Sequence, residues 1–156
     1  MAYINKIVVN GSEVNANQLE GVLDKDGHNR FIEGNLIPET VSGVSPSYYK
    51  WSLSGTHLMI VFVFEADTNI ASETTLATIN VPTWILNKIQ AIASGTTVVT
   101  YKEVIGRTFG TAENYQKDLF VLIKDDGQLQ IISSAITVPG TSTVYRIQFD
   151  LLIDNA

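Results

Sequence analysis

The stretch WSLSGTHLMIVFVF, from Trp51 to Phe64, constrains the fold of this chain more than any other feature. In its first part Trp51 and Leu53 alternate with polar residues, whereas every position from Leu58 to Phe64 is apolar. Side chains of a strand point alternately to the two faces of a sheet. Alternation is therefore typical of a half-solvated strand, and an unbroken apolar run of a strand covered on both faces. We predict one long strand over 49–64 that is solvated in one part and covered in the other.

Strand patterns also fill the rest of the second half of the chain. Asp126-Gly127 lies between two apolar segments and predicts a hairpin, because glycine accepts the positive φ that tight turns need. The final segment, 144–154, alternates, and its apolar face comprises Tyr145, Ile147, Phe149, Leu151 and Ile153. Further strands are predicted over 2–10, 31–32, 75–81 and 96–105. So many short strands predict an all-β fold, an antiparallel β-sandwich or jelly-roll-like head.

Helix is expected only in short pieces. Ser12 is a suitable N-cap for a brief helix over 13–23, and residues 83–89 predict one helical turn after Pro82. A loop rich in Ser, Gly, Pro and Thr is predicted from 38 to 46. We expect this loop to separate an N-terminal attachment segment, residues 1–45, from a β-sandwich head, residues 46–156.

Composition disfavours nucleic acid and membranes as partners. The net charge is −6, and the 10 Lys and Arg residues are scattered singly instead of forming the clusters that bind phosphates. Charged residues make up 17% of the chain, below the level of about 25% in typical soluble domains. The longest apolar run is far shorter than the roughly 18 residues of a transmembrane helix, and the N-terminus predicts no signal peptide.

Residue types of catalytic and metal sites are sparse. The chain has no cysteine, and its two histidines, His28 and His57, have no further ligands at metal-site spacing. No serine lies in a nucleophile motif beside an oriented base. Loop carboxylates such as Glu65 and Glu113 leave open the alternative of a glycan-cleaving enzyme, which needs two opposed acids. We expect no catalytic site, no metal and no cofactor.

The loop that follows the predicted strand at 96–105 has the residue types that bind sugars. Aromatic rings match the apolar C–H face of a sugar, and charged or amide side chains bond its hydroxyl groups. Segment 106–115 combines these types, and a tyrosine precedes it. The candidate saccharide-binding residues are Tyr101, Arg107, Glu113, Asn114 and Tyr115.

Three segments have a pattern of strands and turns in common with a known family. They are KWSLSGTHLM at 50–59, the strand at 75–81 with the following PTWI at 82–85, and YRIQFDLLID at 145–154. In these segments the chain resembles the receptor-binding head domains of tail and baseplate proteins from phages of Gram-positive bacteria. In addition, IVVNG at 7–11 is similar to a tail-attachment segment. The resemblance covers residues 50–154 and consists of strand and turn patterns, without fixed catalytic or sugar-binding residues.

The resemblance implies a non-enzymatic homotrimer in the phage tail of the virion, synthesised in the host cytoplasm. Its partners would be a host cell-wall polysaccharide or teichoic-acid-like polyol, and other tail or baseplate proteins. One face of the apolar run would then meet a neighbouring subunit. The residues expected at this assembly interface are Leu58, Ile60, Phe62 and Phe64. The alternative is a structural baseplate or tail-fibre component that binds no glycan.

Overall fold

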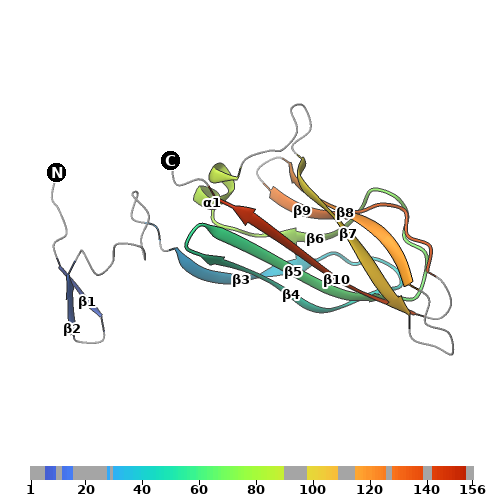
Figure 1. Ribbon diagram of the computed structural model, residues 1–156, viewed down its shortest axis with the longest axis horizontal. Helices are drawn as coiled ribbons and strands as arrows, with labels where there is room; N and C mark the ends of the chain where they lie inside the picture. The colour runs from blue at the N-terminus through green and yellow to red at the C-terminus, as the bar shows by residue number, and fades with distance from the viewer. Residues whose placement is uncertain are drawn as a thin grey trace.

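Strands β3 to β10 close into an eight-stranded antiparallel barrel (Figure 1). The computed structural model describes residues 6–9, 12–15, 28, 30–89, 98–108, 115–125, 128–138 and 142–153. The barrel strands are β3 (Phe31–Pro38), β4 (Val44–Ser54), β5 (His57–Ala66), β6 (Thr74–Ile79), β7 (Val98–Thr108), β8 (Tyr115–Asp125), β9 (Gln128–Ser133) and β10 (Thr143–Leu152). Helix α1 (Thr83–Lys88) follows β6, where one helical turn was predicted.

The order of strands around the barrel is β10-β5-β4-β3-β6-β9-β8-β7. Pairing of β3 with β6, and of β7 with β10, joins two four-stranded sheets at both edges. The predicted all-β, antiparallel fold is confirmed. The sheets close into a barrel, whereas the sequence suggested a sandwich or jelly roll, because the closing pairs join strands that lie far apart in the chain.

The stretch from Trp51 to Phe64 is a hairpin and not one strand. Strand β4 ends at Ser54, β5 begins at His57, and these two residues pair across the turn Gly55-Thr56. Gly55 has a φ of +65°, as a two-residue hairpin turn with glycine in its first central position requires. The prediction of a single strand was wrong, and the change of pattern within the stretch marks the passage from β4 to β5.

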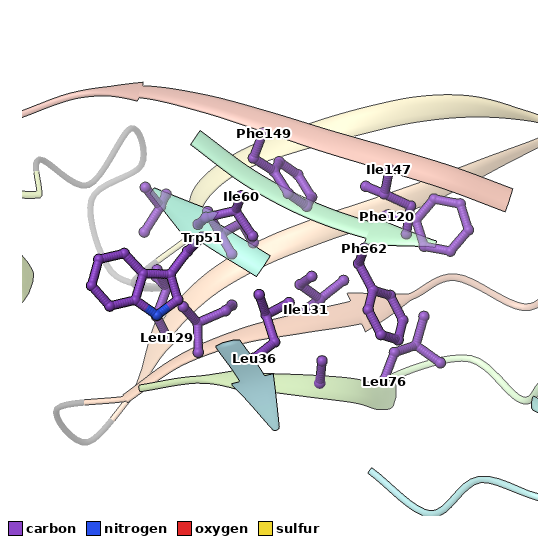
Figure 2. Packing of buried hydrophobic residues seen from close by; sticks show 14 of the residues in the cluster. Leu36, Trp51, Ile60, Phe62, Leu76, Phe120, Leu129, Ile131, Ile147 and Phe149 are labelled. Atoms are coloured by element: carbon purple, nitrogen blue, oxygen red, sulfur yellow. The ribbon is translucent and has the colours of Figure 1, made fainter. Parts of the chain in front are cut away.

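Strand β5 turns one row of apolar side chains into the barrel. Leu58, Ile60, Phe62 and Phe64 have 0% exposure and belong to the hydrophobic core. They pair with the predicted apolar face of β10, which also points inward (Figure 2). The assignment of these four residues to an assembly interface is therefore corrected, because their side chains have no surface left for another subunit to cover.

One polar contact joins the two sheets inside the barrel. The Tyr145 hydroxyl of β10 donates to Asp118 Oδ2 of β8 at 2.5 Å, and both residues are buried. Burial, the hydrogen bond to Asp118 and the negative charge of Asp118 all raise the pKa of the Tyr145 hydroxyl well above its ordinary value. The rings of Phe64 and Phe120 lie against Tyr145, with centroids 5.2 and 5.5 Å from its ring. The bond thus lies within the aromatic part of the core.

The N-terminal strands form a separate two-stranded sheet. Strand β1 (Lys6–Val9), within the strand predicted over 2–10, pairs with β2 (Ser12–Asn15). The prediction of a helix over 13–23 was wrong for its first residues, because residues 13–15 belong to strand β2. Residues 16–23 lie outside the described part of the chain. The barrel begins at Phe31, so the predicted boundary after residue 45 falls inside it.

Helix α1 packs Ile85 and Leu86 into the core. Lys124 Nζ, from β8, donates to the Leu86 carbonyl at 2.8 Å near the end of this helix. His28 stacks on Trp84 of the helix, with ring centroids 4.4 Å apart. This stack connects the chain just before β3 to the barrel.

The hairpin predicted at Asp126-Gly127 is confirmed by the pairing of Asp125 with Gln128, while the two turn residues lie outside the described part of the chain.

Candidate functional site

The outer surface of β5 is apolar where a solvated strand would be polar. Its outward residues are Met59, Val61 and Val63, bounded by the exposed His57 and Glu65 at the strand ends. Met59 is 39% exposed, whereas Val61 is only 6% exposed although it points away from the core. Something on the outer surface therefore covers Val61.

The cover comes from the strands on either side of β5. The register sets Lys50 of β4 and Gln148 of β10 directly opposite Val61. Residues directly opposite each other on one face of a sheet lie within contact distance. Because lysine and glutamine have long aliphatic stems, they shield the valine while their polar ends remain toward water. The apolar centre of this face is thus bordered by polar groups.

Around this centre the surface is hollowed. The hollow has a volume of about 480 Å³ and is lined by Tyr48, Met59, Val61, Val63, Arg146 and Gln148. We call it the sheet hollow. One nitrogen of Gln148, Nε2, lies 3.3 Å from a carboxylate oxygen of Asp150 and donates to it. An apolar floor with an aromatic ring, a guanidinium and an amide at its edge is suited to non-covalent binding.

A second hollow lies at the loop between β3 and β4. It has a volume of about 370 Å³ and is lined by Pro38, Glu39, Thr40, Val41, Val44, Pro46 and Tyr49. We call it the loop hollow. Tyr49 is 37% exposed although it pairs with the buried Phe62. Its ring thus offers a partly solvated aromatic surface beside two prolines, a carboxylate and a hydroxyl.

The predicted saccharide-binding residues are divided between two places. Arg107 of β7 is exposed and pairs with Tyr115 of β8, so the backbone brings these two positions together. Glu113 and Asn114 lie outside the described residues. Tyr101 is 67% exposed but lies six residues before Arg107 on the same strand, which corresponds to about 20 Å. Tyr101 therefore does not join the others in one sugar site.

Several of the described carboxylates have structural partners. Glu65 accepts a hydrogen bond from the Ser142 hydroxyl, and Asp118 is held inside the barrel by Tyr145. Within the described ranges, no three His, Asp or Glu side chains are grouped as a metal site would require. No helix in that part of the chain is both long and apolar enough to span a membrane.

Comparisons with known proteins find only distant similarity, to solved structures at low identity. No family model matches the sequence, and no curated protein matches it. The reovirus attachment protein sigma1, solved in complex with α-2,3-sialyllactose, is similar at 9% identity and a TM-score of 0.44, covering 100% of this chain and 89% of that chain. The fibre head domain of snake adenovirus 1, an Atadenovirus, is similar at 8% identity and a TM-score of 0.30. The match covers 76% of this chain and 94% of that chain. Both are viral attachment or fibre-head proteins. Because both TM-scores lie below 0.5, neither determines the function of this chain.

Sequence reasoning missed both hollows. Arg146 and Gln148, which line the sheet hollow, alternate with the apolar residues of the last predicted strand, and that pattern alone indicates no hollow. The sequence did contain a signal for the pairing of β4 with β5. Ser54-Gly55-Thr56-His57 predicts a two-residue hairpin turn if the glycine adopts a positive φ. Placing a turn there aligns Tyr48 with Val63 and exposes the alternate face of β5.

Proposed function

We propose that this chain is the receptor-binding head of a phage tail or baseplate protein, that it is not an enzyme, and that it acts as a homotrimer. The observation that carries this proposal is the recessed apolar row Met59, Val61 and Val63, with its charged and polar groups at the border. An apolar centre with a polar rim is the usual anatomy of a protein interface. We assign this face to contacts between subunits, in place of the four inward residues of β5.

The direction of the chain through the barrel also supports an attachment role. Strand β3 begins at the end of the barrel that carries the Gly55-Thr56 turn, since Phe31 pairs with Ser54. The β3–β4 loop and the ends of β7 and β8 at Thr108 and Tyr115 lie at the opposite end (Figure 1). An N-terminal attachment segment would then leave this loop end facing a host surface.

In this proposal the head binds a host cell-wall polysaccharide or teichoic-acid-like polyol. Arg107 and Tyr115 contribute at the end of the β7–β8 pair, together with Glu113 and Asn114 from the loop between them. A single sugar site on a protein surface is weak. Three linked sites on one trimer raise the apparent affinity because, after the first contact, the others bind at high effective concentration.

A cell-binding assay tests the function. Fluorescently labelled protein should bind host cells, and free cell-wall polysaccharide should compete with it. Light scattering should give three times the mass of the chain at micromolar concentration. Absence of cell binding, together with formation of a complex with another tail protein, would favour the structural baseplate component instead. Release of reducing ends that is lost in Glu113→Gln would favour the glycan-cleaving enzyme.

A further inference from the structure

We propose that the loop hollow is a saccharide site of its own, and that it selects neutral or amino sugars over acidic ones. This inference rests on the proposed function, because it names a sugar class and a site for the same recognition. The hollow is lined by the β3–β4 loop and the first half of β4, away from the segment 106–115 that the sequence indicated.

The lining of the hollow combines the two kinds of group that recognise a sugar. Tyr49 presents a partly exposed ring, and Pro38 and Pro46 add rigid apolar surface. Such surfaces pack against the C–H face of a pyranose ring. Glu39 and Thr40, both exposed, supply a carboxylate and a hydroxyl for the sugar hydroxyl groups. The volume of about 370 Å³ lies within the range of about 300–1,000 Å³ found for small-molecule sites.

The loop that forms the rim is held in place before any ligand arrives. Gly43 has a φ of +72°, and its carbonyl accepts a hydrogen bond from Asp67 N at 3.0 Å. A Cβ at this position would lie 1.9 Å from Thr68 Oγ1, so no other residue fits. The hydroxyl of Thr68 in turn donates to the Ser42 carbonyl at 3.3 Å. Such bracing lowers the ordering cost of binding.

The carboxylate of the hollow is also positioned. Thr78 Oγ1 donates to Glu39 Oε1 at 3.1 Å, and Glu39 N donates to the Leu76 carbonyl at 2.9 Å. These two bonds attach the residue to β6 and leave Oε2 available to accept from a sugar hydroxyl. The carboxylate is thereby held at the rim by the neighbouring strand.

Charge determines the class of sugar. Among the described residues that line the hollow, Glu39 alone is charged at pH 7, and the whole chain carries a net charge of −6. A sialic acid, a uronic acid or a phosphate would meet a carboxylate with no cation in this described lining to balance it. A neutral or amino sugar meets an acceptor that suits its hydroxyl or ammonium groups. In the sheet hollow, by contrast, Arg146 would favour an acid.

The loop hollow lies at the same end of the barrel as Arg107 and Tyr115. The register links Ser45 to Glu65, Glu65 to Val144, and Val144 to Arg107. Three strand spacings of about 4.8 Å each separate the first and last of these positions. A polysaccharide of several units can therefore contact both regions of one subunit, and the loop hollow would select the unit at one end.

Saturation-transfer NMR on the full chain tests the site with two probes, a neutral N-acetylglucosamine oligomer and the acidic sugar sialyllactose. The neutral oligomer should receive saturation and sialyllactose should receive at least about fivefold less. Tyr49→Ala should reduce the neutral signal at least tenfold, and Glu39→Gln about threefold. Glu39→Gln is the variant that keeps the fold, since glutamine can accept the same bond from Thr78. The control is Ile37→Ala, which removes an exposed side chain next to Pro38 outside the hollow and should change nothing.

Three results would overturn this inference. The first is a neutral signal that persists in Tyr49→Ala, and the second is its loss in Arg107→Ala instead. The third is a sialyllactose signal as strong as the neutral one that Tyr49→Ala abolishes. Cell binding measured on the same variants keeps the two proposals apart. If the neutral signal persists in Tyr49→Ala while cells still bind this variant and polysaccharide still competes, the loop hollow is excluded and the attachment function stands. If the wild-type protein binds neither cells nor either probe, the attachment function fails.

Discussion

The outer faces of the two sheets of this barrel both carry apolar side chains, but they place their charges differently. On the β4–β5–β10 face, Met59, Val61 and Val63 follow one another along the strand, and the ionised groups lie on the neighbouring strands at the border. On the β7–β8 face, the exposed Tyr101 and Ile105 lie on either side of an ion pair between Glu103 and Lys117.

This difference decides which face can be covered at low cost. Covering the first face removes an apolar row from water and leaves the charges at its edge hydrated. Covering the second would bury an ion pair in the middle of the contact, and the loss of hydration of two charges opposes burial. Exposed apolar area alone therefore does not identify an interface, because the position of the nearest charges matters as much.

The largest expected effect tests which side of β5 is the core. Phe62→Ala should lower the free energy of unfolding by about 3–5 kcal/mol, because it empties a fully buried ring site. Val63→Ala, one residue further and facing outward, should cost less than about 1 kcal/mol in the dissociated protein. Urea denaturation of both variants at low protein concentration measures this. Equal losses would show that the two faces of β5 are equally packed.

The next effect compares the two outer faces directly. Met59→Asp should raise the dissociation constant of the trimer at least about 100-fold, because it places an unpaired charge in the proposed contact. Ile105→Asp, the matched change on β7, where the side chain is 62% exposed, should leave the trimer intact. Light scattering over a dilution series gives both values. A trimer that survives the first change and dissociates with the second would reverse the assignment of the faces.

A smaller effect concerns the bond that joins the two sheets inside the barrel. Tyr145→Phe should cost about 1–3 kcal/mol at pH 7, because the buried Asp118 loses a donor. The pKa of Tyr145 is raised on folding, so the folded protein keeps a proton that the unfolded chain releases above about pH 10. Stability due to this hydroxyl is therefore complete below pH 10 and is lost as the pH rises further, with a slope of up to about 1.4 kcal/mol per pH unit.

Unfolding measured between pH 7 and pH 11 should show that alkaline slope in the wild type and a shallower one in Tyr145→Phe. Tyr48→Phe changes an exposed tyrosine of the outer face and should retain the wild-type slope. Identical slopes in all three proteins would mean that Tyr145 loses its proton as readily in the barrel as in the unfolded chain.

The smallest effect is expected at the ion pair of the second face. Glu103→Ala should change the free energy of unfolding by less than about 0.5 kcal/mol, since both side chains are more than half exposed and exposed pairs contribute little. It should also leave the oligomeric state unchanged. If this variant instead promotes further association, the ion pair is what keeps the β7–β8 face free of contacts, which would sharpen the comparison of the two faces.

Local pattern predicted the elements of the fold better than their pairing. The alternation from Tyr145 to Ile153, the helical turn at 83–89 and the hairpin around Asp126-Gly127 all follow from neighbouring residues, and the structure agrees with them. The stretch at 51–64 was misread because a strand covered on both faces and two strands joined at Gly55 give the same apolar sequence. The local signal that separates these two cases is Ser54-Gly55-Thr56-His57, and the register of Ser54 with His57 shows the hairpin.

The candidate sites show the same division. The sugar-binding types in 106–115 were visible in the sequence, yet the distance of Tyr101 from Arg107 depends on β7 continuing as one strand. The loop hollow requires Pro38 and Tyr49 to meet across a turn that Asp67 and Thr68 brace from a different loop. No local pattern carries that information, because the bracing residues lie more than twenty positions away.

By itself, the sequence determined that this chain is built from antiparallel strands, that its last strand has one apolar face, and that β5 has apolar residues on both sides. These properties follow from side-chain spacing along one strand. The tertiary structure alone decided which apolar row of β5 lies inside, that the sheets close into a barrel, and that Arg146 and Tyr48 lie on either side of Val63. These three features depend on pairing between distant segments. A shift of one residue in that pairing would exchange the inner and outer faces of β5.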